Sequence, residues 1–250
     1  MKILCEIIAG SRLYGIETSD SDFDRRGVFL NTDPAKILGL EKEEIFKESG
    51  QDSLFFELNH YLKNLRKTNT QALEILFAEK FVKFSEEFVC IQNNRYKLID
   101  SKKLFSSLMG YIKNEKKLAI GIRKGSLGSK RRNQLEKFGF SPKNFSHMIR
   151  LAFCGATFFK TAYYPVSLKE YKIRDLIFSI KTEPEKYKIE TLNEIAEEKI
   201  NELKISFEER EKNYDFDLDF ANSVCLKLYK PYLWAKNDFF WNGTIFFKKN

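Results

Sequence analysis

The chain has 250 residues, of which 43% are hydrophobic, so it is long enough to bury one large core or two small ones. Its 43 basic residues outnumber its 35 acidic residues, and the formal charge of +8 favours contact with polyanions such as nucleotides or RNA. No apolar run approaches the ~18 residues that span a bilayer, and the four cysteines lie too far apart for a zinc motif. These features predict a soluble, cytoplasmic globular protein with reduced thiols and no membrane partner.

The first predicted element is a buried strand over residues 2–9, an apolar and β-branched run. The run leads directly into Gly10 and Ser11, where a small residue lets the backbone approach a ligand closely. A helix that begins near Ser11 would direct its free N–H groups and its dipole toward an anion. The pair therefore indicates a phosphate-binding turn, although an ordinary turn after a strand has the same residues.

Two aspartates follow within one short loop. Asp22 and Asp24 stand at positions i and i+2, so on an extended strand their side chains share one face. Two carboxylates on one face suit Mg²⁺ or Mn²⁺, because such a metal takes few protein ligands and keeps positions for phosphate oxygens. The alternative is a solvated acidic turn. A calcium-binding EF-hand loop is excluded, because its sixth position would be Arg25 instead of glycine.

The order of these motifs resembles a known superfamily. Residues 10–15 read Gly-Ser-Arg-Leu-Tyr-Gly, and residues 21–28 read Ser-Asp-Phe-Asp-Arg-Arg-Gly-Val. Together they are similar to the nucleotidyltransferase superfamily of the DNA polymerase beta type. More narrowly, they resemble bacterial and phage nucleotidyltransferases described as RNA repair pathway polymerase-beta-like proteins.

The resemblance implies an α+β fold, a small mixed sheet with flanking helices followed by a mainly helical region. It places Gly10 and Ser11 at the triphosphate of a bound nucleotide and Asp22 and Asp24 on the metal. Lesser phosphate contacts are expected from two further residues, Arg12 and Arg26.

A third metal-binding carboxylate is expected from the next strand. Residues 52–58 read as a short strand that runs into a helix over residues 59–67, and their two acids fall on opposite faces. Glu57 has the apolar-acid-apolar surroundings of the superfamily and is the preferred ligand. Asp52, at the start of the strand, is the alternative, and a solvent-exposed strand end would explain either acid.

The next segment, residues 69–77, predicts an amphipathic helix with Leu73, Leu76 and Phe77 facing inward. It resembles the family's Asn-Pro-x-x-Leu-Glu-x-Leu segment, with Thr70 in place of proline. By its position, Glu74 is equally compatible with a capping role or with a surface charge.

A later segment carries three cationic or titratable residues at helical spacing. Lys143, His147 and Arg150 are separated by four and three residues, so one helical face presents all three. The segment resembles the family's Gly-Tyr-x-x-Lys-x-x-x-His-x-x-Arg-Leu element. A cationic face of this kind would clamp a polyphosphate against the metal. Ordinary surface bases beside a packed histidine are the alternative.

The chain is predicted to divide into a nucleotidyltransferase core over residues 1–100 and a helical domain over residues 101–250 that completes the nucleotide and acceptor site. The expected function is Mg²⁺-dependent transfer of a nucleoside monophosphate from an NTP such as ATP to an acceptor hydroxyl, with release of pyrophosphate. An RNA 3′ end, as in tRNA repair, is the first acceptor to consider, and a protein or a small molecule is the competitor. A non-catalytic nucleotide- or RNA-binding protein of the same fold is the alternative of another class.

Overall fold

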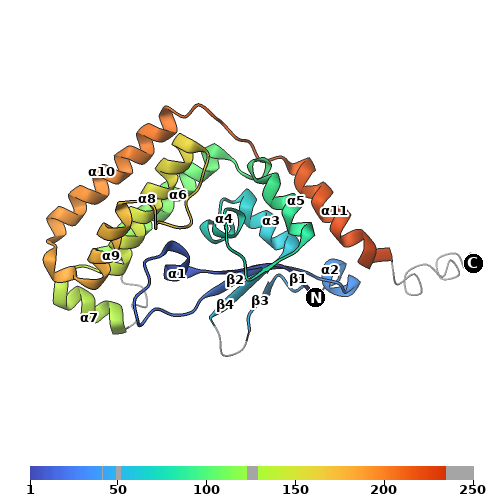
Figure 1. Cartoon of the computed structure of the whole chain (residues 1–250), viewed down its shortest axis with the longest axis horizontal. Helices are drawn as coiled ribbons and strands as arrows, with labels where there is room; N and C mark the ends of the chain where they lie inside the picture. Colours follow the sequence, from blue (N-terminus) through green and yellow to red (C-terminus); the bar gives the residue numbers. More distant parts are fainter. Residues whose placement is uncertain (41, 49–51, 123–128, 235–250) are drawn as a thin grey trace, which may run out of the picture.

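The computed structural model describes residues 1–40, 42–48, 52–122 and 129–234. Within them the chain forms a small mixed sheet of five strands, with helices against the sheet and a set of longer helices beside it (Figure 1). The expected α+β class is therefore confirmed.

The sheet has the strand order β3-β4-β2-β1-β5. Strands β2 and β4 are parallel, and the pairs β1–β2, β1–β5 and β3–β4 are antiparallel. The parallel register pairs Arg25 with Ser53 and Phe29 with Glu57. This register decides which acids meet at one end of the sheet. The bounds of the strands are β1 Lys2–Ile8, β2 Arg25–Leu30, β3 Ile45–Phe46, β4 Ser53–Glu57 and β5 Lys83–Phe84.

Short helices connect and cover the strands. Helices α3 and α4 lie over one face of the sheet (Figure 1), and their apolar side chains pack on core residues of β1 and β2 such as Ile7 and Val28. Alternate residues of a strand share a face, so the burial of one face of the sheet fixes the register in which neighbouring strands pair. The elements of this half are α1 Gly10–Tyr14, α2 Pro34–Leu38, α3 Leu58–Arg66, α4 Thr70–Leu76, α5 Glu86–Asn93 and the 3₁₀ turn η1 Arg95–Leu98.

The remaining described residues are helical. Helix α8 is the centre of this half: it packs on α6, α9 and α10, and its glycine Gly155 lets leucines of α6 and α10 approach closely. The last helix, α11, returns to the first half, where the Tyr229 hydroxyl donates a hydrogen bond to Glu57. The elements are α6 Ser101–Ala119, α7 Ser129–Phe138, α8 Pro142–Thr161, α9 Ile173–Thr182, the 3₁₀ turn η2 Pro184–Lys186, α10 Ile189–Glu208 and α11 Leu218–Trp234.

Most predicted elements are present with small shifts of their ends. The strand over residues 2–9, the helix over residues 59–67 and the helix over residues 69–77 correspond to β1, α3 and α4. The main difference concerns the two aspartates, because β2 begins at Arg25 and leaves Asp22 and Asp24 in the loop before it. None of the helices among the described residues is both long and apolar enough to cross a bilayer.

Candidate active site

The Gly-Ser turn brings the backbone of the first half against one of the aspartates. Gly10 has φ of +65°, a left-handed conformation that glycine adopts without a side-chain clash. A Cβ atom at Gly10 would lie within 3.0 Å of both Cγ and Oδ2 of Asp24. The Ala9 N–H also donates to the Asp24 carbonyl at 2.9 Å. The start of α1 and the Asp24 carboxylate are therefore in direct contact, and only glycine fits between them.

Asp24 and Asp52 lie side by side at the same end of the parallel pair β2–β4. Each directly precedes its strand, and the Arg25 N–H donates to the Asp52 carbonyl at 2.9 Å. Partial burial raises the pKa of Asp24, and the hydrogen bond and the charge of Asp52 raise it further, while Arg26 acts in the opposite direction. Asp22 is exposed, and its charge also reaches Asp24. Two carboxyl groups that hydrogen bond to one another have oxygens close enough to share a cation.

Glu57, the preferred third carboxylate, is in a different place, and the alternative Asp52 is the acid that lies beside Asp24. It ends β4, so five residues of extended strand, about 16 Å, separate it from the aspartates. Its carboxylate caps α3 by accepting the Asn59 N–H at 2.8 Å and also accepts the Tyr229 hydroxyl. Glu57 is therefore a buried capping residue that joins β4, α3 and α11. Alternation along a strand separates the faces of Asp52 and Glu57, but it does not determine which end of the strand lies at the site.

A cavity of about 650 Å³ opens beside the aspartates. Its walls come from the starts of β2 and β4, from the residue after β3 and from the first turn of α4: Asp24, Arg25, Arg26, Lys47, Asp52, Ser53, Leu54 and Gln71. This volume is in the range of small-molecule and cofactor sites. The wall is polar and carries both signs of charge, as a site for a charged ligand and a cation requires.

The three-residue set Lys143, His147 and Arg150 lies on α8 as predicted, but its members have different environments. Arg150 is mostly but not fully buried, with its guanidinium 3.7 Å from the centre of the Tyr14 ring and 3.4 Å from the Glu74 carboxylate. The His147 ring faces Glu115 across 3.5 Å. Lys143 is exposed. The helical face is therefore only partly available to a ligand.

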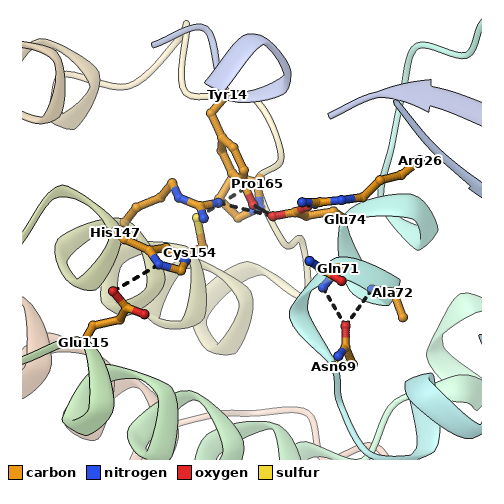
Figure 2. A network of polar contacts seen from close by, with 11 residues as sticks. Tyr14, Arg26, Asn69, Gln71, Ala72, Glu74, Glu115, His147, Cys154 and Pro165 are labelled. Carbon is orange, nitrogen blue, oxygen red and sulfur yellow. Dashed lines mark hydrogen bonds and ion pairs between the residues drawn. The ribbon is translucent and has the colours of Figure 1, made fainter. Parts of the chain in front are cut away.

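Glu74 is the centre of a polar network that joins the two halves of the chain (Figure 2). It forms ion pairs with Arg26 of β2 and Arg150 of α8 and accepts the Tyr14 hydroxyl at 2.9 Å. Burial by itself would raise the pKa of Glu74, but the charges of the two arginines and the Tyr14 hydrogen bond lower it overall. Glu74 is therefore an ionised structural residue, and a solvated surface charge is ruled out because the residue is 4% exposed.

Arg12 holds the aspartate loop. Its guanidinium donates to the Ser21 and Asp22 carbonyls at 3.1 and 3.4 Å and lies over the Phe23 ring, with 5.5 Å between the guanidinium carbon and the ring centre. Arg12 was predicted to contact phosphate. That contact stays a prediction, and in this structure the Arg12 nitrogens fix the backbone that carries Asp22.

Helix α9 supplies cations that the sequence did not single out. Arg174 and Lys181 donate to the carbonyls of Gly15 and Ile16, each at 2.7 Å, and so hold the end of α1. Burial lowers the pKa of Lys181, and the charges of Lys143 and Arg150 lower it further. Positive charge is therefore concentrated beside α1. No local motif marks these residues, because their spacing from α1 is set by the packing of α9 on α8.

The metal-binding capacity of the site rests on carboxylates alone. The described residues contain no preformed group of three or more His, Cys, Asp or Glu side chains in ligating positions. Asp24 and Asp52 nevertheless offer paired hard oxygen donors, and Asp22 is in electrostatic reach. This donor set fits Mg²⁺, which binds one or two carboxylates and completes its shell with water and phosphate.

Comparison with known proteins agrees with the resemblance drawn from the motifs. The family model described as RNA repair pathway DNA polymerase beta family matches residues 1–227. The matched region includes the Gly-Ser turn, the aspartates and helices α4, α8 and α9. No curated protein and no solved structure matches the chain.

Proposed function

Because this chain belongs to the RNA repair pathway DNA polymerase beta family, we propose that it is a Mg²⁺-dependent nucleotidyltransferase that moves NMP from an NTP to an acceptor hydroxyl. The single observation that carries the proposal is the contact of Gly10, Asp24 and Asp52 at the edge of a cavity of about 650 Å³. The arrangement suits the binding of a polyphosphate and a divalent metal at one place.

The proposed metal ligands are Asp24 and Asp52, with Asp22 as the third carboxylate. When bound, Mg²⁺ would neutralise charge on the phosphate oxygens. Asp24 and Asp52 directly precede the paired strands β2 and β4 and both line the cavity, so their carboxylates are available to the same cation. Glu57 has no part in this set, since its oxygens are occupied by the Asn59 N–H and the Tyr229 hydroxyl.

The triphosphate is proposed to lie along α1. The first amides of a helix have no partner within it, and Gly10, the first residue of α1, adjoins Asp24. The cationic side chains of Lys143 and Lys181 lie beyond the other end of α1. There they would neutralise part of the negative charge of the β- and γ-phosphates. Arg150 and Arg26 act on the triphosphate only indirectly and are not assigned a phosphate contact, because Glu74 already pairs with both.

The reaction forms a bond between the acceptor oxygen and the α-phosphorus and breaks the bond from that phosphorus to the bridging oxygen of the β-phosphate. The electron pair of the broken bond leaves with pyrophosphate. The proton of the acceptor hydroxyl passes to the Asp52 carboxylate, which lines the cavity and is exposed to it.

The test is labelling with each α-³²P NTP in the presence of Mg²⁺ and total RNA, total protein or small-molecule extracts. Asp24→Asn and Asp52→Asn are expected to abolish labelling, whereas Glu57→Gln, a matched loss of one carboxylate at the other end of β4 from Asp52, is expected to keep it once its folded fraction is corrected for. Loss of labelling in Glu57→Gln together with full activity in Asp52→Asn would contradict the assignment.

Binding of Mg²⁺-ATP by calorimetry separates the enzyme from a non-catalytic binding protein. Equal nucleotide affinity in the wild type and in Asp24→Asn, with no labelling by either, would identify a binding protein of this fold.

A further inference from the structure

Along the sheet, the cavity beside the aspartates extends from β2 toward β4, whereas helix α1 follows β1 on the other side of β2. Helix α1 follows β1, whereas the cavity walls come from β2, β4, the residue after β3 and helix α4. In the sheet order, β4 and β3 are on one side of β2 and β1 is on the other. Asp24, at the start of β2, therefore separates the α1 side from the cavity side.

This arrangement assigns the NTP to the α1 side of Asp24 and the acceptor to the cavity side. The assignment rests on the proposed function. In phosphoryl transfer the attacking oxygen and the leaving oxygen are roughly in line through the phosphorus atom. If the departing pyrophosphate lies along α1, the attacking hydroxyl must come from the other side of Asp24. The cavity is on that side, and Asp52 in its wall is placed to take the proton of the hydroxyl.

The chemistry of the cavity wall indicates what carries that hydroxyl. Two of its cations are committed elsewhere: Arg26 pairs with Glu74, and Arg25 pairs with Glu6 and Glu48. Lys47 is exposed and has no hydrogen bond or ion pair with any residue that the structure describes. An unpaired ammonium in the wall of this cavity favours an anionic ligand.

Another residue of the wall offers a different kind of contact. Gln71 lies in the first turn of α4, and its N–H is held by the Asn69 side chain at 2.9 Å (Figure 2). Its carboxamide has no partner among the described residues, although it lines the cavity. A carboxamide presents a donor and an acceptor together, the combination that reads the edge of a nucleobase. Leu54 adds an apolar surface nearby.

We propose that this cavity binds the 3′-terminal nucleotide of an RNA acceptor, with Lys47 contacting the terminal phosphodiester and Gln71 contacting the terminal base. A protein side chain would need neither an unpaired cation nor a base-reading amide next to its hydroxyl. The cavity volume of about 650 Å³ also suits one nucleotide.

The test measures the KM for the RNA acceptor and the KM for the NTP separately. We expect Lys47→Ala to raise the KM for a short single-stranded RNA about five- to tenfold, to leave the KM for NTP within about twofold, and to reduce the salt dependence of RNA binding by about 0.7 in log–log slope. Lys160→Ala is the matched control, because it removes one exposed charge from the last turn of α8, far along the chain from the cavity. It is expected to change neither KM.

Gln71→Ala tests the contact with the base. Alanine is a good helix former, so α4 is expected to stay folded. With four RNAs that differ only in their 3′-terminal base, the wild type is expected to have unequal KM values and the variant to have values that converge to within about twofold. A circular RNA of the same sequence, which has no terminal nucleotide, is expected to lose the Lys47-dependent part of the affinity.

Fluorescence anisotropy of labelled RNA keeps the inference testable when no transfer occurs. Weaker binding by Lys47→Ala than by Lys160→Ala would support the cavity as the RNA site even if the nucleotidyltransferase proposal failed. Efficient transfer to RNA with an unchanged KM in Lys47→Ala would overturn the inference while the proposed function stood. Labelling of a protein or a small molecule in place of RNA would also overturn it.

Discussion

Substitution of Gly10 by alanine tests the contact between the Gly-Ser turn and Asp24. Two costs arise. The left-handed backbone, with φ of +65°, costs an alanine about 1–2 kcal/mol in the free energy of unfolding. In addition, the new Cβ would lie within 3.0 Å of two atoms of the Asp24 side chain. The carboxylate must therefore move by roughly 1 Å, and a displacement of that size in an active site can cost about 100-fold in rate.

Gly139 provides a matched control, because it has φ of +76° and a Cβ there would meet no atom within 4 Å. Gly139→Ala carries the same backbone cost without the clash. Both variants are expected to lose about 1–2 kcal/mol in urea denaturation. Only Gly10→Ala is expected to lose about two orders of magnitude in the initial rate of NMP transfer per folded molecule.

A double variant shows whether the loss passes through Asp24. If the alanine acts by moving this carboxylate, Gly10→Ala in the Asp24→Asn background should add little to the loss of Asp24→Asn alone, because residues that act as a unit are not additive. Transfer by Gly10→Ala within threefold of Gly139→Ala would refute the reasoning. Full additivity of the two changes would show that Gly10 acts on something other than Asp24.

Three further predictions concern the polar contacts that join the two halves. Glu74→Gln leaves Arg26 and Arg150 without their buried counter-charge, so we expect a loss of about 3–5 kcal/mol in the free energy of unfolding, measured in urea, and a loss below 1 kcal/mol would contradict an ionised Glu74. Because folding lowers the pKa of Glu74, its contribution is present above its unfolded pKa of about 4.3 and is lost as pH falls through its folded pKa; denaturation from pH 6 to 3 should show a smaller loss in Glu74→Gln than in the wild type. Tyr229→Phe removes a hydrogen-bond donor from the buried Glu57 and should lower stability by about 1–3 kcal/mol, seen as a lower Tm, while an unchanged Tm would show that α11 does not stabilise the end of β4.

Local sequence patterns were sufficient to predict the secondary-structure elements named below and the Gly-Ser turn. A β-branched run followed by Gly-Ser predicts a strand that ends in a tight turn, and the structure has β1 followed by Gly10 in a left-handed conformation. The amphipathic pattern of residues 69–77 likewise predicts α4. Such signals are local, because hydrophobic period and backbone preference act over a few residues.

The partners of single charges could not be predicted in the same way. Glu74 was open to a capping or a surface role, and it is the buried counter-charge of two arginines, one of which lies 76 residues farther along the chain. Lys181 drew no attention in the sequence, yet its ammonium lies 2.7 Å from the Ile16 carbonyl. Contacts between distant segments depend on how helices pack, which no short motif encodes.

The sequence by itself determined which chemical groups are present and in what order they follow: a glycine-serine turn, paired aspartates and a basic helix. Together these are the motifs of one family. The tertiary structure decided which of them meet. The parallel register of β2 and β4 brings Asp52 to Asp24 and carries Glu57 to the far end of the sheet. The reason is physical, because strand pairing is chosen by burial of a whole face, and the position of each acid along the sheet follows from that choice.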